Sequence, residues 1–269
     1  MPPQIVPISL ERHGSRSFRR FSSYEFAAKD TVVPLVGAEL AKATLSFPIA
    51  FLNEEKKAVP VAVLGVEPGS NLFIAPDGRW AGPYIPAAFR AHPFVLAQTQ
   101  DNKQILCINE ASGLVLEDGS GEPFFTPEKR PSEPVEKILD FLTKLHENRV
   151  VTERACEVIS RLDLLEPWPF QAPGETGPRQ VAGLWRISES KMNRLEDQAF
   201  LELRHTGGLA LAYAQLMSMG HQASLERLAV LRTEARRQAS AAVPASLDPI
   251  FGIPGQTEEF EIDWSKFKS

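Results

Sequence analysis

The periodicity of apolar residues changes near the middle of this chain, and that change constrains the fold more than any other feature. In the first half, short apolar runs are separated by polar turns. The runs 47–52 and 58–66 flank one turn, and the runs 94–99 and 104–109 flank another. Two apolar runs joined by a few polar residues are typical of a β-hairpin. The first half therefore predicts antiparallel sheet.

A proline, Pro60, falls inside the second of these runs. Proline has no backbone N–H, so it removes one hydrogen bond from any sheet that contains it. We therefore expect the run 58–66 to be an edge strand, or to begin as a strand at this proline.

Beyond about residue 130, apolar residues recur at helical spacing. Two series show this: Val135, Ile138, Leu142 and Leu145, then Val151, Ala155, Val158 and Leu162. The run 209–219 is apolar on nearly all sides, which is typical of a helix buried at the centre of a domain. The proline-rich stretch 166–180 cannot be the interior of a helix. The residues that follow it, 181–187, can return to the sheet as a strand.

These patterns predict an α+β fold with a mainly antiparallel, β-rich N-terminal half and a helical C-terminal half. We place the β-rich part at 1–130 and the helical part at 131–240. The two parts are expected to be integrated around a shared or adjoining core, because 181–187 can rejoin the sheet. Residues 241–269 form an acidic, aromatic C-terminal arm.

The arm has its own pattern. Phe260, Ile262 and Trp264 alternate with Glu261 and Asp263, which would place three apolar groups on one face of an extended strand. We expect the arm to dock on the body of the protein or on a second copy of the chain, where it would favour a homodimer. A mobile acidic tail is the alternative.

Composition excludes several classes of protein. The net charge is −5 and the pI about 5.7, so the chain offers no overall basic field for nucleic acid. Two cysteines, Cys107 and Cys156, are too few for a disulfide framework or a structural zinc site. We expect Cys107, within an apolar run, to be a buried and inert thiol.

No local motif indicates a metal or a cofactor. The histidines at 13, 92, 146, 205 and 221 are never three or four residues apart, so none forms a helical metal-binding pair. The glycine-rich phosphate loop, the dinucleotide fingerprint, the serine nucleophile elbow and the zinc-protease helix motif are all missing. We expect no cofactor and no metal.

The chain also shows no membrane segment. Its first residues lack the apolar stretch of a signal peptide. No window approaches the roughly 18–20 consecutive apolar residues that span a bilayer. We therefore expect no transmembrane segment and a cytoplasmic location.

The stretch 77–94, DGRWAGPYIPAAFRAHPF, is the densest group of unusual residues. Trp80 and Tyr84 combine flat apolar faces with polar edges, and the planar guanidinium of Arg90 suits a carboxylate or a phosphate. Together they would suit a peptide or an amino acid. The alternative is a rigid corner in which turns and aromatic side chains fill the core without a ligand.

Three residues that follow the apolar run 104–109 extend this hypothesis. Glu110 and Ser112 leave a buried-looking strand directly, and Gly113 allows a close approach of backbone. We therefore add all three to the candidate ligand-binding residues.

An enzyme is the competing hypothesis. It would use Glu110 with His92 or His205 as acid and base, and needs at least two of these side chains in one cavity. A structural role for His205 at the end of a helix is the alternative.

Several blocks of the sequence occur together in one known family. They are VPISLERH, VPLVGAEL and FPIAFL near the start, then NLFIAPDGRWAGPYIPAAFRAHPFVLAQ, LCINEASGLVLEDGSGEPFF and GLWRISESKMNRLEDQAFLELRHTGGLALAYAQLMSMGHQASL. In this order they closely resemble the SapC family of bacterial proteins, from about residue 5 to 231. The family takes its name from a gene associated with a surface-layer locus. No catalytic residues are established for it, so the resemblance gives no active site to carry over to this chain.

The sequence thus predicts a non-catalytic binding or accessory protein of the SapC type, which recognises a peptide, protein or amino-acid-like partner. Two alternatives stay open: an enzyme of unrecorded chemistry, and a structural protein associated with a surface layer.

Overall fold

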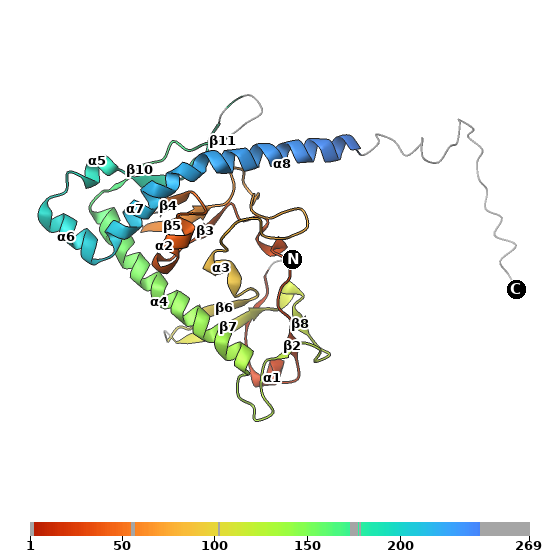
Figure 1. Ribbon diagram of the computed structural model, residues 1–269. Helices are drawn as coiled ribbons and strands as arrows, with labels where there is room; N and C mark the ends of the chain where they lie inside the picture. The colour runs from red at the N-terminus through yellow and green to blue at the C-terminus, as the bar shows by residue number, and fades with distance from the viewer. Residues whose placement is uncertain (1–2, 55–56, 102, 173–176, 178, 243–269) are drawn as a thin grey trace, which may run out of the picture. The chain divides into compact units, whose positions relative to one another are not determined.

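The computed structural model describes residues 3–54, 57–101, 103–172, 177 and 179–242 (Figure 1). Residues 1–230 form one compact unit, and 231–269 form a second. Of the second unit only the helical stretch to Ala242 is described. The first two residues of the predicted C-terminal arm, 241 and 242, end α8, and the rest of the arm, 243–269, lies outside the described residues.

A five-stranded antiparallel sheet forms the larger of two main sheets, in the order β10-β13-β4-β5-β3. Its strands are β3 (Val32–Pro34), β4 (Ile49–Glu54), β5 (Lys57–Val63), β10 (Leu165–Pro167) and β13 (Trp185–Ile187). The predicted hairpin at 47–66 is confirmed as β4 and β5. The predicted return of 181–187 to the sheet is confirmed for the last three of those residues.

The position predicted for Pro60 is wrong. It lies in β5, between β4 and β3, opposite Phe51 and away from either edge of the sheet. The carbonyl of Pro60 accepts a hydrogen bond from Leu35 N at 2.8 Å, directly after β3 ends at Pro34. The missing N–H therefore falls where the pairing with β3 stops, so an interior strand can hold this proline.

The second main sheet has three antiparallel strands in the order β1-β7-β6: β1 (Ile5–Pro7), β6 (Phe94–Gln98) and β7 (Gln104–Asn109). The second predicted hairpin is confirmed as β6 and β7. Short strands complete the set: β2 (Ser17–Phe18) pairs with β8 (Val115–Leu116) and β9 (Glu122–Pro123), and β11 (Gln171–Ala172) pairs with β12 (Arg179–Gln180).

One long helix, α4 (Glu133–Arg161), joins the cores of the two sheets. The two helical series of the sequence are parts of this single element. Near its start, Val135 and Leu142 pack with residues of the three-stranded sheet. Near its end, Cys156 and Ile159 pack with residues of the five-stranded sheet and the later helices. Figure 1 shows α4, in green, running past both sheets.

The other helices are α1 (Leu10–His13), α2 (Leu40–Ala43), α3 (Ala87–Arg90), α5 (Glu189–Met192), α6 (Asp197–His205), α7 (Gly208–Ser218) and α8 (Gln222–Ala242). Single 3₁₀ turns lie at η1 (Glu25–Ala27), η2 (Gly37–Glu39), η3 (Glu110–Ser112) and η4 (Met219–His221). The chain thus has the predicted α+β fold. Among the described residues, no helix is long and apolar enough to cross a membrane.

The burial predicted for α7 is only half right. Leu211 and Ala212 are buried, but Tyr213 and Met217 on the opposite side are exposed. The buried side includes Gln215, whose Oε1 accepts from Ile187 N at 2.9 Å and whose Nε2 donates to Ile49 O at 3.3 Å. This polar side chain ties α7 to the backbones of β13 and β4.

Candidate ligand-binding site

The stretch that contains Trp80 folds as a tight corner. Gly78 has a φ of +79°, which only glycine adopts readily, and Trp80 pairs with Ile74 as an isolated bridge. The indole Nε1 donates to Tyr84 O at 2.7 Å, and the ring stacks on Phe73 with centroids 5.7 Å apart. Trp80 therefore supports the corner, and its polar edge is already engaged.

Tyr84 lies over a buried carboxylate. Its hydroxyl donates to Glu39 Oε1 at 2.9 Å, and Ala87 N donates to the same oxygen at 2.6 Å. Val36 N donates to Glu39 Oε2 at 3.2 Å. Burial, together with the neighbouring Glu39 carboxylate, raises the pKa of Tyr84 to about 12. Glu39 thus ties together η2, the turn at Tyr84 and the start of α3.

Arg90 is held in place without being neutralised. Its Nε and Nη2 both donate to Ile85 O, at 2.9 and 2.7 Å, and the guanidinium carbon lies 4.8 Å from the centroid of the Tyr84 ring. The side chain is exposed, and no carboxylate within the described residues forms an ion pair with it. Donors of this group remain available for an anion.

Tyr84 and Arg90 line a pocket of about 220 Å³ between α2, α3 and α4. Its apolar side chains come from Val36, Ala87, Phe141 and Leu145, and its cations are Lys42, Arg90 and Lys144. Lys144 pairs with Asp140 at 2.7 Å. The pocket therefore combines a small apolar surface with cationic groups.

Glu110 lies in a different environment, a cluster of basic residues at the end of β7. Its Oε1 accepts from Arg12 Nε at 2.7 Å and from Arg16 Nη1 at 3.1 Å. His13 Nε2 is 3.4 Å from the same oxygen. The hydrogen bonds from Arg12 are the largest cause that lowers the pKa of Glu110. These contacts join the N-terminal helix α1 to the strand that precedes Glu110.

His13 is a buried titratable residue beside Glu110 that was not among the predicted site residues. Its side chain is fully buried, and its Nδ1 accepts from Ser9 N at 3.3 Å. In the neutral ring the proton is therefore on Nε2, which faces Glu110. Burial lowers the pKa of His13. The N-cap serine Ser9, four residues earlier, was the available signal that a short helix begins here.

Ser112 lines a third region, beside His92, and Gly113 follows Ser112 directly in the chain. Ser112 and His92 share a pocket of about 850 Å³. The His92 ring stacks on Phe26 with centroids 3.7 Å apart, and burial lowers its pKa. Ser112 Oγ accepts from Leu114 N at 3.2 Å. Gly113 has a φ of +70°, as a left-handed turn residue.

The structure thus brings Trp80, Tyr84 and Arg90 together, and places Glu110 and Ser112 elsewhere. Of the residues proposed as acid and base for an enzyme, Glu110 does not line the pocket that contains His92. Glu110 contacts His13, whereas His205 is exposed at the end of α6, which packs on the C-terminal part of α4. Glu39 and Lys42 were not predicted as site residues, because they are distant from Tyr84 in the sequence and approach it only in the folded chain.

Possible metal ligands and thiols give no further site. Within the residues that the structure describes, no three histidine, cysteine, aspartate or glutamate side chains are clustered as a metal site would need. Cys107 and Cys156 are buried, and burial raises the pKa of Cys156 to about 12. A thiol with this pKa is inert at neutral pH.

The fold and pocket define an α+β protein with a small pocket that three cationic side chains line. Residues 8–225 match the model of the SapC family, and the chain belongs to that family. A search of curated proteins found no match, and neither did a search of solved structures.

Proposed function

We propose that this SapC protein is a non-catalytic binding protein that takes the free carboxylate end of a peptide, or an amino-acid-like ligand, in the pocket beside Tyr84. The observation that carries the proposal is the state of Arg90. Its guanidinium is fixed by Ile85 O and by the Tyr84 ring, yet it has no carboxylate partner among the described residues. A planar guanidinium held in this way is suited to a carboxylate.

The charges around the pocket support an anionic ligand. Lys42, on α2, adds a second exposed cation for which no ion pair occurs in the described part of the chain. Glu39 would oppose an anion, but its two oxygens already accept three hydrogen bonds from backbone and from Tyr84. Its negative charge is therefore partly compensated where the ligand would lie.

The size of the pocket supports a terminal group. A volume of about 220 Å³ is below the usual range of drug-sized ligand pockets, and it accommodates one side chain more readily than a long segment. Phe141 and Leu145 of α4 would contact the apolar part of such a residue. The rest of a peptide would lie outside the pocket.

A pair of peptides tests the proposal directly. Short peptides that end in leucine or phenylalanine are prepared with a free C-terminal carboxylate and with a C-terminal amide, and their binding to the full chain is measured by calorimetry. We expect the free acid to bind, and amidation or Arg90→Ala to weaken binding by about tenfold or more, since a charge-assisted pair is lost.

Arg79→Ala is the matched control. Arg79 is also an exposed arginine of the same corner, but its Nε already pairs with Asp77 at 2.6 Å. This variant is expected to bind the acid normally. The proposal is wrong if acid and amide bind alike, if neither binds, or if Arg79→Ala loses as much affinity as Arg90→Ala.

A further inference from the structure

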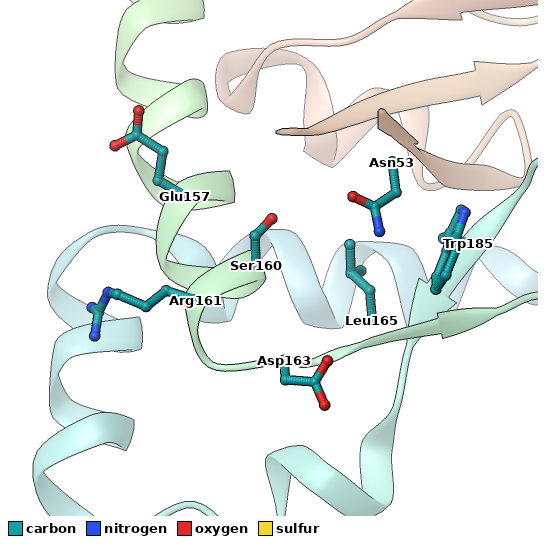
Figure 2. Close-up of a pocket in the computed structure, with 7 residues that line it drawn as sticks. All are labelled: Asn53, Glu157, Ser160, Arg161, Asp163, Leu165 and Trp185. Atoms are coloured by element: carbon teal, nitrogen blue, oxygen red, sulfur yellow. The ribbon is translucent and has the colours of Figure 1, made fainter. Parts of the chain in front are cut away.

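A separate cavity, larger than the pocket beside Tyr84, lies at the C-terminal end of α4. Its volume is about 600 Å³, and its lining comes from the end of β4, the last turns of α4, and strands β10 and β13. Figure 2 shows seven of its residues, among them Asn53, Ser160, Leu165 and Trp185. None of these residues belongs to the pocket beside Tyr84.

Asn53 is polar where the strand pattern calls for an apolar side chain. The residue pairs with Ala58 across the hairpin and shares a strand face with Phe51, which is fully buried. The polar run that begins at residue 53 predicts a turn, but β4 continues through residue 53 to Glu54. The Asn53 amide is thus carried into the interface between β4 and the end of α4.

Two oxygen atoms at the inner end of this cavity have no hydrogen-bond partner within the described chain: Asn53 Oδ1 and Ser160 Oγ. Both are shielded from solvent. Figure 2 shows the two oxygens turned toward the same space. Such groups are costly to leave unsatisfied in a protein interior. To reach a ligand in the cavity, each oxygen has to turn about its Cα–Cβ bond.

The charged residues of the cavity lie at its rim and are mostly engaged. Arg161 pairs with Glu202, and Asp163 pairs with Lys191 at 2.7 Å. Glu157 and Arg161 point away from Asn53 in Figure 2. The inner surface is therefore neutral, with one amide and one hydroxyl group. The one cation among the lining residues, Arg161, is already paired with Glu202, so a phosphate group would compete with that carboxylate.

The side of the cavity that the sheet forms is apolar and partly aromatic. The indole of Trp185, which is partly buried, and the side chain of Leu165 lie on the side of the cavity formed by β13 and β10. A single indole face next to amide and hydroxyl groups suits a ring that has C–H groups on one side and hydroxyl groups at its edge. A pyranose sugar has this chemistry, and a cavity of this volume can enclose one.

We propose that this cavity binds a neutral monosaccharide unit, with the ring against Trp185 and its hydroxyl groups hydrogen-bonded to Asn53 and Ser160. The proposal is independent of the carboxylate pocket. A nucleoside would also combine a flat face with hydroxyl groups, but the described lining offers one aromatic face rather than a pair that would enclose a base. A phosphorylated sugar would meet one cation among the lining residues, Arg161, which already pairs with Glu202.

The test uses the intact protein and defined probes: D-glucose, D-galactose, N-acetyl-D-glucosamine, glucose 6-phosphate and adenosine. Binding is followed by saturation-transfer NMR, in which magnetisation passes from the protein to a bound ligand. We expect transfer to the C–H protons of at least one neutral sugar. Ser160→Ala and Asn53→Leu are each expected to weaken that binding by about tenfold or more.

Stability measurements separate a ligand site from a buried structural water. If the two oxygens form hydrogen bonds only when a ligand is bound, Asn53→Leu leaves the melting temperature of the free protein unchanged or raises it, because an unsatisfied polar group is replaced. Arg90→Ala, in the other pocket, must leave sugar binding intact. The proposal is overturned if no neutral sugar binds, if adenosine or glucose 6-phosphate binds better, or if Asn53→Leu lowers the melting temperature while Ser160→Ala leaves sugar binding unchanged.

Discussion

Glu39 shows how one buried side chain can organise segments that are far apart in the sequence. Its carboxylate accepts from Val36 N within its own turn, and from Tyr84 and Ala87 some 45 residues later. A buried carboxylate is tolerable only when its oxygens are satisfied in this way. The position of the aromatic corner therefore depends on an acid that lies outside it.

Tyr84 is expected to titrate late. With a pKa of about 12, its phenol stays neutral at pH 10, where an ordinary tyrosine is half ionised. Because the folded pKa is raised, Tyr84 stabilises the fold fully below pH 10, and this contribution is lost as the pH rises toward 12. The phenolate absorbance of the folded protein measures this. In Tyr84→Phe the latest ionisation step is expected to disappear, and an unchanged titration would contradict the assignment.

Glu110 has the opposite pH dependence. Its folded pKa lies below its ordinary value of 4.5, so its contribution is present above about pH 4.5 and is lost as the pH falls through the folded pKa. Glu110→Gln is expected to lower the free energy of unfolding at pH 7 by about 1–2 kcal/mol, since charged hydrogen bonds to Arg12 are lost. At acidic pH, the free energies of unfolding of Glu110→Gln and of the wild type are expected to become more similar.

Glu117→Gln provides the control for that measurement. Glu117 pairs with Arg16 as Glu110 does, but its side chain is 74% exposed against 12% for Glu110. An exposed ion pair contributes little. Chemical denaturation at several pH values is expected to show a clear loss for Glu110→Gln and almost none for Glu117→Gln. Equal losses would mean that Glu110 is an ordinary surface acid.

At the scale of elements, α4 is the part on which both sheets depend. It has 29 residues and therefore spans about 43 Å, long enough to contribute buried side chains to two separate clusters. The short helices around it have few residues of their own and rely on contacts to α4 and to the sheets.

The end of α4 is expected to be sensitive to truncation of a single side chain. Ile159 is fully buried, and Ile159→Ala is expected to cost about 2–4 kcal/mol because it leaves a cavity. Val151→Ala, on the same helix but 58% exposed, is expected to change the stability by less than about 0.5 kcal/mol. Denaturant unfolding measures both, and similar losses would place Ile159 outside the core.

The elements predicted correctly from sequence are those that local contacts determine. Both hairpins depend on neighbouring runs of the chain. The errors arise where a distant segment decides the outcome. Pro60 is tolerated because β3 ends beside it. Glu110 lies away from the other candidate residues because it pairs with Arg12, which is 98 residues earlier in the chain. No local pattern contains that information.

At the scale of the whole molecule, residues of the first and last thirds of the compact unit meet in one sheet. β13 joins β4 through the pair Trp185 and Phe51, and β10 extends the sheet further. The predicted integration of the two halves stays a proposal as far as domain boundaries are concerned. Cutting the chain near residue 130 would separate β13, and β10 that pairs with it, from β4.

The C-terminal arm can be tested by truncation. The alternation of Phe260, Ile262 and Trp264 with acids predicts an arm that docks on the body or on a second copy of the chain. Ending the chain after Ala242 is therefore expected to lower the melting temperature, or to reduce the solution mass from that of a dimer to that of a monomer. Light scattering and thermal unfolding measure the two quantities. If neither changes, the arm does not dock.

The bond pattern of Gln215 also limits which amino acids this position can accept. Its side chain accepts from one strand and donates to another, so it takes the place of a peptide group between β13 and β4. Glutamate of the same length would lack the donor, asparagine would fall short by one carbon, and leucine or methionine would fill the volume but leave both backbone groups unsatisfied. Each replacement fails for a different reason. Of these five side chains, only glutamine therefore meets every requirement of position 215.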